Sequence, residues 1–289
     1  MGQKDLTQKN LESYPDVFAD LINVLVYKGQ AVLREEELFL TQTETLYQHN
    51  QKELRNQLQD LGMNVIKNGQ IQARYMLENQ TKPDHRLPLR KAGYHGAIYR
   101  RQYTGKELYP VIGSVLYWGR RKWRQPCTLK TLLGKNEFAL CSTEYIDDLK
   151  INVFEMTKLE NDVRKKFQSD IRVIVDYLAE GEQYIPSRQK LMHPEEVLLT
   201  LSALTGDHRF EDIIPEVKDE EEPRMCELID RYEKRGEKRG KELGAAREIV
   251  LFGEDYKLSA QEIMDRLKSR LGLEEGKAAA YYERYRRKA

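Results

Sequence analysis

The segment Gln59–Gln80, "QDLGMNVIKNGQIQARYMLENQ", decides the fold. Two β-prone runs flank Asn68-Gly69, a dipeptide that strongly favours a tight turn between antiparallel strands. The segment therefore predicts a β-hairpin. Because side chains alternate between the two faces of a strand, Glu78 and Gln80 share one face at the end of the second strand.

The first strand of this hairpin begins near a second carboxylate, Asp60. Regular pairing around a two-residue loop would place Asp60 opposite Leu77, on the face away from Glu78, because cross-strand partners share a face. An irregularity of one residue would instead place Asp60 opposite Glu78. We expect either a β-bulge at Gly62 or a three-residue loop that contains Gly69.

The rest of the first 215 residues predicts helices and strands on both sides of this hairpin. We expect a helix from about Pro15 to Tyr27, and a helix or irregular lead-in from Thr43 to Leu58. A helix with a basic face should follow the hairpin. Two further strands and two later helices are then indicated by "YPVIGSVLYWG" (109–119), "KINVFEM" (150–156), "FQSDIRVIVDYLAEG" (167–181) and "HPEEVLLTLSALTGD" (193–207). The predicted class is mixed α/β.

The last part of the chain has a different composition. Residues 216–222 form an acidic run, and "EKRGEKRG" at Glu233–Gly240 repeats a four-residue unit. Ser259 and Glu262 have the spacing of a capping box at the start of a helix whose apolar stripe needs a partner. We expect a domain at 1–215, and at 216–289 an acidic linker, a charged repeat and a helical tail. The unpartnered stripe suggests a homo-oligomer.

Charge and cysteine content exclude several classes. The 289 residues include 48 basic and 47 acidic residues, so no bulk charge draws the chain onto nucleic acid and any binding needs a local patch. Three widely spaced cysteines indicate neither a zinc ribbon nor a disulfide framework. No signal peptide and no run of about 18 apolar residues is present. We expect a cytoplasmic protein without a membrane partner.

Two carboxylates at one end of a hairpin could hold a metal ion. Asp60 and Glu78 would offer hard oxygen ligands of the kind that Mg²⁺ prefers. A divalent ion there could activate water for attack on a phosphodiester, and the Gln80 amide could hold that water. The alternative is two solvated carboxylates beside a hairpin, since charged side chains are mostly exposed.

Several blocks of the sequence resemble one nuclease family. The blocks "FADLINVLVYKGQ", "LENQT", "HRLPLR", "LYPVIGSVLYWG" and "LKINVFEM" occur in order between Asn10 and Gly181. They are similar to the Rpn (recombination-promoting nuclease)/putative transposase family, a branch of the PD-(D/E)XK nuclease superfamily. The resemblance implies a restriction-endonuclease-like core, a mixed central sheet flanked by helices, with a helical C-terminal extension.

The resemblance also implies a function and a site. It implies a Mg²⁺-dependent DNA endonuclease of little sequence specificity, with Mn²⁺ as a substitute ion. Asp60 and Glu78 would hold the metal, and Gln80 would replace the lysine of the superfamily. Asp20 on the first helix would be an accessory acidic residue. The alternative is a catalytically inactive module that keeps the fold and binds DNA or another protein.

Histidine and basic residues near the site leave two interpretations open. His85 could shuttle a proton or lie in solvent, and Arg90 with its basic neighbours could neutralise phosphates or form a solvated helix face. "WGRRKWRQP" at Trp118–Pro126 interleaves two tryptophans with four basic residues. This segment could stack and bind single-stranded nucleic acid, or be a loop that tryptophans anchor in the core.

Overall fold

The fold is seen in a computed structural model that describes residues 10–41, 44–50, 53–58, 61–134, 143–217 and 220–287. The chain forms two compact units, Met1–Met225 and Cys226–Ala289. The domain boundary expected at residue 215 stays a prediction.

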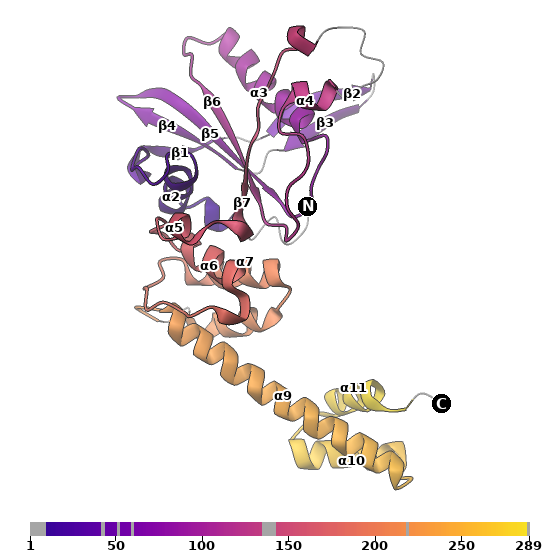
Figure 1. Ribbon diagram of the computed structural model, residues 1–289. Helices are drawn as coiled ribbons and strands as arrows, with labels where there is room; N and C mark the ends of the chain where they lie inside the picture. Colours follow the sequence, from indigo (N-terminus) through magenta and orange to yellow (C-terminus); the bar gives the residue numbers. More distant parts are fainter. Residues whose placement is uncertain are drawn as a thin grey trace. The chain divides into compact units, whose positions relative to one another are not determined.

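A mixed five-stranded sheet forms the centre of the first unit (Figure 1). Its strands lie in the order β1-β4-β5-β6-β7, and β1, β4 and β5 are antiparallel to one another in turn, whereas β5, β6 and β7 are parallel. The bounds are β1 Leu38–Leu40, β4 Leu61–Lys67, β5 Gln70–Gln80, β6 Val111–Tyr117 and β7 Asn152–Glu155.

The β4–β5 hairpin has a two-residue loop. Lys67 pairs with Gln70, and both loop residues have positive φ, +52° at Asn68 and +75° at Gly69. These values are those of a type I′ turn, whose twist matches that of the flanking strands. The three-residue loop is therefore wrong, and so is Gly69 as the place of an irregularity.

The expected irregularity is nevertheless present in the same hairpin. Ile66 pairs with Ile71 but Val65 pairs with Ala73, so Gln72 on β5 is the extra residue of a β-bulge. The prediction of a shift of one residue is confirmed, and its placement at Gly62 is wrong. Beyond the bulge the register continues without interruption to Leu61 opposite Leu77.

Two helices cover opposite faces of the sheet. On one face the hydroxyl of Tyr27, just after α2 (Pro15–Leu25), hydrogen-bonds the hydroxyl of Tyr75 on β5. On the other face Ile98 of α3 (Leu87–Tyr103) packs against Met76. Because side chains alternate along β5, its last residues point in turn to the α2 face and to the α3 face. Glu78 and Gln80 share the α3 face.

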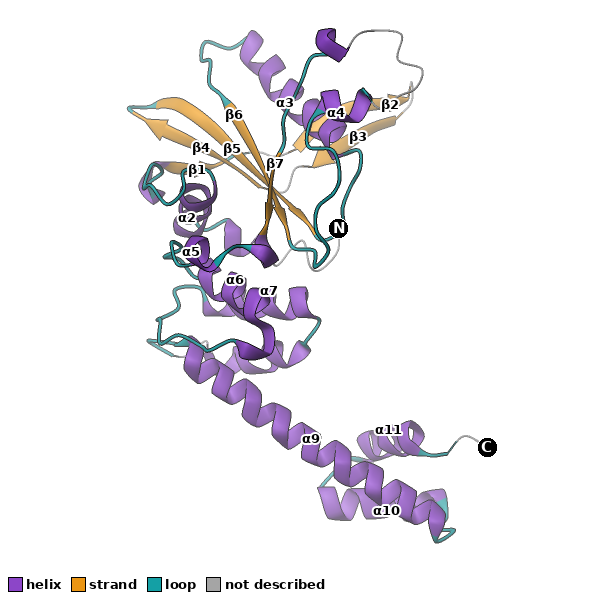
Figure 2. Cartoon of the chain, viewed as in Figure 1, coloured by secondary structure: helices purple, strands orange, loops and turns teal. Residues whose placement is uncertain are grey.

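A second, two-stranded sheet corrects the prediction for residues 43–58. The chain forms β2 (Glu44–Asn50) and β3 (Glu53–Leu58), which pair antiparallel (Figure 2), rather than a helix or irregular segment. Pairing gives the backbone N–H and C=O groups of each polar strand hydrogen-bond partners, which the sequence pattern of either strand alone does not predict. Tertiary pairing of this kind overrides a weak local helix preference.

The remaining elements of the first unit are short helices and the two longer helices that the sequence predicts. Pro194 lies in the first turn of α7, as expected from its missing amide hydrogen. The α-helices are α4 Leu129–Leu133, α5 Asn161–Arg164, α6 Ile171–Glu180, α7 Pro194–Thr205 and α8 Ile214–Val217; the 3-10 helices are η1 Glu35–Glu37, η2 Thr143–Tyr145, η3 Met156–Lys158, η4 Gly181–Gln183 and η5 His208–Ile213.

The second unit is helical. The charged repeat lies inside α9 (Met225–Asp255), which Figure 2 shows as one uninterrupted helix. The capping box of Ser259 and Glu262 starts α10 (Ala260–Leu271), and α11 (Glu275–Tyr285) follows. A mixed sheet flanked by helices, with a helical C-terminal region, confirms the predicted fold class.

The apolar stripe of α10 finds its partners within the same chain. A buried cluster of this unit contains Ala246, Val250, Ile263, Leu267 and Ala278, from α9, α10 and α11. The homo-oligomer proposed from that stripe loses its argument and stays a prediction. Among the described residues, no helix combines the length and the hydropathy that crossing a membrane requires.

Candidate functional site

Glu78 lies near the end of β5 with its carboxylate on the α3 face of the sheet. Its exposed fraction is 4%, although an isolated buried carboxylate is costly. It pairs across the sheet with Val115, which belongs to a buried cluster with Leu87 of α3. The hairpin and the first turn of α3 thus enclose one charged side chain.

Two cations from consecutive positions of α3 compensate this charge. The Lys91 Nζ lies 2.7 Å from Glu78 Oε2, and the Lys91 side chain is only 2% exposed. The Arg90 guanidinium hydrogen-bonds Glu78 Oε1 and lies 3.4 Å from Asp84 Oδ2. Burial alone would raise the pKa of the Glu78 carboxyl, but the charges of Lys91 and Arg90 hold this pKa below its ordinary value.

Gln80 completes the contacts of this carboxylate. Its Nε2 donates to Glu78 Oε1 at 2.9 Å. The two residues are neighbours on one strand face, as the alternation of β5 predicts. The pairing of Glu78 with Gln80 on one face is therefore confirmed.

Asn79, between these two residues, serves the opposite face. Its Nδ2 donates to Glu12 Oε2 at 2.7 Å, and its Oδ1 accepts from Trp118 Nε1 at 2.6 Å. All three side chains are buried. Within residues 78–80, Glu78 and Gln80 therefore form the charged site, whereas Asn79 joins two segments that are distant in the sequence.

His95 lies one turn beyond Lys91 on the same face of α3. Its ring approaches β6 so closely that a Cβ at Gly113 would lie 2.7 Å from His95 Nε2. Burial, together with the charge of Lys91, lowers the pKa of His95 from 6.5 to about 4. The ring is therefore neutral near pH 7.

The two other carboxylates predicted for the site are Asp60 and Asp20. Asp60 lies outside the described residues. Asp20 is on α2 and accepts hydrogen bonds from Gln168 N at 2.9 Å and from Ser169 N and Oγ at 2.8 and 2.7 Å. Burial raises the pKa of its carboxyl, although these bonds oppose the rise. Asp20 thus fastens α2 to the segment before α6 and does not contact Glu78.

Arg90 and His85 have different outcomes. Arg90 contacts Glu78 directly and belongs to the site. The exposed His85 instead places Nδ1 3.2 Å from Gln125 Oε1, in the loop after β6. The structure places it beside the site and not in contact with Glu78.

Lys91 is the residue that the sequence analysis missed as an individual. It is one of the basic neighbours of Arg90 in the sequence, yet it shares a helical face with buried Leu87, Tyr94 and Ile98. A lysine at an apolar position of a helix is a usable signal, because a buried lysine requires a partner. Its position one turn from Leu87 and one from His95 could have identified it.

The comparison with protein families decides the relationship. The family described as "Putative transposase, YhgA-like" matches residues 21–203, well over half of the 289 residues. The chain belongs to this family. No curated protein and no solved structure matches the chain significantly. The predicted family is confirmed, and the match includes Glu78, Gln80, Arg90 and Lys91.

The donors of this YhgA-like chain fit a hard cation chemically. Glu78 and Gln80 present oxygen donors, and Glu78 Oε2 is buried beside Lys91 without a well-directed hydrogen bond. Mg²⁺ binds such oxygens. Within the described ranges, no group of three or more His, Cys, Asp or Glu side chains could hold a metal ion. Asp60, the second ligand that the resemblance implies, lies outside these ranges.

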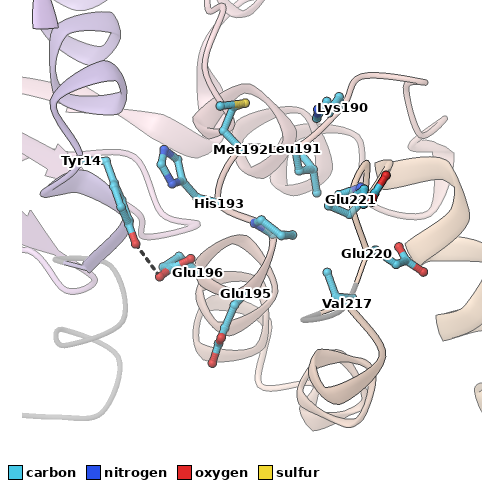
Figure 3. A pocket seen from close by; sticks show the side chains of 12 residues that line it. Tyr14, Lys190, Leu191, Met192, His193, Glu195, Glu196, Val217, Glu220 and Glu221 are labelled. Atoms are coloured by element: carbon cyan, nitrogen blue, oxygen red, sulfur yellow. Dashed lines mark hydrogen bonds between the residues drawn. The ribbon is translucent and has the colours of Figure 1, made fainter.

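A separate pocket lies at the start of α7 (Figure 3). Tyr14 stacks on His193 with ring centroids 3.7 Å apart and donates to Glu196 Oε1 at 2.8 Å. His193 Nε2 also lies 3.1 Å from both carboxylate oxygens of Asp16. Four glutamates line this pocket: Glu195, Glu196, Glu220 and Glu221. Their negative charge is the wrong sign for a phosphate, so the Glu78 site is the better candidate in this family member.

Proposed function

We propose that the protein is a metal-dependent DNA endonuclease that hydrolyses phosphodiester bonds with little sequence specificity. The observation that carries the proposal is the buried Glu78 carboxylate, which is held by Lys91, Arg90 and Gln80 at the end of a central strand. Membership in a family described as transposases supports DNA as the substrate. The predicted PD-(D/E)XK relationship adds the expectation of Mg²⁺ or Mn²⁺.

The hairpin register supports Asp60 as the second metal ligand. The bulge at Gln72 brings Leu61 opposite Leu77, and Asp60 and Glu78 are their neighbours in the sequence. We propose that the register continues by this one residue. Directly opposed residues of an antiparallel pair have Cβ atoms about 5 Å apart, so in this register Asp60 and Glu78 would both be near enough to hold one ion.

Each side chain of the site has a proposed role. Asp60 and Glu78 hold the ion, and Gln80 orients the attacking water through its amide. Lys91 and Arg90 place positive charge beside the carboxylate and offset the charge of an incoming phosphate. When bound, Mg²⁺ supplies Lewis-acid stabilisation and lowers the pKa of a coordinated water.

A second candidate function is a DNA-binding module without catalysis. One observation favours it: both oxygens of Glu78 already contact cations, Arg90 at Oε1 and Lys91 at Oε2. A metal ion would have to compete with these contacts. In this alternative the ion pairs hold α3 on the sheet and have no chemical role.

A plasmid-nicking assay separates the two functions. Wild type should nick supercoiled plasmid in Mg²⁺ or Mn²⁺ and not in EDTA, and Asp60→Asn and Glu78→Gln should each lower the rate by about 100-fold or more. Asp20→Asn is the matched control, because Asp20 is also a partly buried carboxylate but bonds only to the segment before α6. Each variant is assayed below its own melting temperature.

Two results would count against the endonuclease. Wild type that binds DNA but never nicks it, with any divalent ion, would favour the inactive module. An activity that survives in Glu78→Gln and Asp60→Asn would place the chemistry elsewhere in the chain.

A further inference from the structure

The loop after β6 is anchored by two tryptophans that point into the protein. Trp118 is 5% exposed and Trp123 is 9% exposed. The Trp118 indole donates to Asn79, and the Trp123 ring packs edge-on to Tyr117 with centroids 5.1 Å apart. Of the two interpretations of this segment, core anchoring is the one that the structure bears out.

Between and beside these anchors the loop presents only exposed cations. Arg120, Arg121, Lys122 and Arg124 are all exposed. None of the four makes an ion pair with another residue in the described part of the chain. Four like charges on one short loop repel each other, so their gathering favours an anionic ligand.

The turn between β5 and α3 adds further positive charge beside this loop. Lys82 and Arg86 are exposed in this turn. The two segments are joined by the contact of His85 with Gln125 at 3.2 Å. The loop also begins at the site, since Trp118 N donates to Gln80 O at 2.8 Å.

The carboxylates within reach of this surface are already occupied. Asp84 contacts Arg90 and accepts from the Arg86 amide at 2.9 Å. Glu155 accepts from Trp123 N at 3.0 Å and from Lys158 Nζ at 2.9 Å. The charge of Lys122 helps to lower the pKa of the Glu155 carboxyl, so the charge left for a ligand is carried mainly by Arg120, Arg121 and Arg124.

We propose that residues 119–125, together with the turn at 81–86, form a surface that binds the phosphate backbone of duplex DNA. We call it the cationic rim. Its link to cleavage rests on the function proposed above, because the rim would hold the substrate beside Glu78. Its ability to bind DNA does not depend on that chemistry.

The orientation of the tryptophans favours duplex over single-stranded DNA. Single strands are held without sequence preference by stacking of bases on exposed aromatic rings. In residues 81–86 and 119–125 the structure offers no exposed Trp, Tyr or Phe ring, since Trp123 is buried. Charge alone remains, and it suits the regular phosphates of a duplex, which are read without base contacts.

The test measures binding of a fluorescent duplex of mixed sequence to the full chain in EDTA, between 50 and 200 mM NaCl. Replacing Arg120, Arg121, Lys122 and Arg124 by alanine should weaken binding at least about tenfold and flatten the slope of log K against log salt by about 3 to 4, since each phosphate contact contributes about 0.9. Replacing the three arginines by lysine should retain most of the affinity, because a phosphate contact needs charge more than shape.

The matched control removes four exposed cations elsewhere on the first unit, Lys28, Arg34, Lys165 and Arg188. This variant has the same net charge as the rim variant and should bind nearly as wild type does. Thermal melting of both variants by circular dichroism verifies their folding. A rim variant that melts as wild type yet keeps its affinity and salt slope would overturn the proposal.

Two further results distinguish this proposal from the proposed chemistry. A wild type that binds duplex through the rim but never nicks plasmid would retain the rim and remove the endonuclease. A wild type that nicks plasmid, with a rim variant that binds and nicks equally well, would do the reverse. Binding to a single strand that is much tighter than to the duplex would also contradict the rim as proposed.

Discussion

Burial and the two cations of α3 act in opposite directions on the charge of Glu78. Burial penalises the ionised carboxylate, whereas Lys91 and Arg90 stabilise it. A charge of this kind is retained at a cost, because an apolar set of residues of the same volume would often be as stable. The protein keeps it at the end of a strand where chemistry is proposed, and this placement favours a functional reason over a structural one.

Removing Lys91 should reveal the cost of the buried carboxylate. We expect Lys91→Met to lower the free energy of unfolding by about 3 kcal/mol, because it leaves Glu78 buried with one cation instead of two. Adding Glu78→Gln should recover part of that loss, since the uncompensated charge then disappears. Urea unfolding of both single variants and the double variant measures the coupling.

Arg90→Met is the matched control for this cycle. The Arg90 side chain is 36% exposed, against 2% for Lys91, so solvent screens its contact with Glu78. We expect a loss of about 1 kcal/mol or less. Equal losses for the two variants would show that burial does not decide the strength of these contacts.

His95 should make stability depend on pH. The unfolded chain takes up a proton near pH 6.5 and the folded His95 only near pH 4, so the unfolded state binds more protons between these values. Above pH 6.5 His95 therefore costs the folded state no free energy of unfolding, and this free energy falls as the pH decreases toward 4. At pH 5 the loss from this residue is about 2 kcal/mol.

The pH effect is measured as the difference in unfolding free energy between pH 7.5 and pH 5.0. In His95→Gln this difference should be smaller than in wild type by about 2 kcal/mol. Gln102→Ala should leave it unchanged, because Gln102 is a buried residue of the same helix that has no ionisable group. The interpretation fails if both variants behave alike.

At the scale of elements, the turn of the β4–β5 hairpin sets the register. Asn68 and Gly69 both have positive φ, which a β-branched residue adopts only under strain. Gly69→Val should therefore destabilise the protein by about 1–2 kcal/mol. Asn68→Gly, in which the new residue accepts positive φ freely, should have little effect, and thermal melting compares the two.

The hairpin also shows what local sequence can predict. Asn68-Gly69 specifies the turn because only a few residues tolerate its φ values, and the alternation of β5 specifies the common face of Glu78 and Gln80. The bulge at Gln72 was not located, because no residue type marks a bulge without glycine or proline. The helical spacing of Lys91 with Leu87 indicates that Lys91 is buried, but its partner Glu78 lies on another element and is known only once α3 packs on the sheet.

Longer-range features were also predictable only in part. The capping box of α10 involves residues three apart and was identified correctly. The covering of α10 by α9 and α11 needed the tertiary structure, as did the pairing of β2 with β3. Local signals thus identify the elements, and contacts between elements decide which side chains meet.

At the scale of the whole molecule, the two units suggest a truncation. The buried residues Leu228 and Ile229 lie near the start of α9, whereas residues 233–240 carry no buried side chain. A chain that ends at Arg239 should keep the cooperative melting of the first unit and the nicking activity proposed above, because it retains the whole of Met1–Met225 and the Glu78 site within it. Circular dichroism melting and the plasmid assay test this expectation. Loss of the melting transition would show that the second unit is required for the first to fold.

In the 119–125 segment of the cationic rim, the residues that stabilise the fold are different from the residues that carry the surface charge. Trp118 and Trp123 anchor the segment in the core, so the exposed side chains at positions 120, 121, 122 and 124 are not needed for packing. Mutations there change surface charge at little cost in stability, since surface substitutions away from special features are usually within about 0.5 kcal/mol of neutral. A lineage, or a directed-evolution library confined to those four codons, can therefore retune affinity for a polyanion step by step without first acquiring compensating mutations in the core.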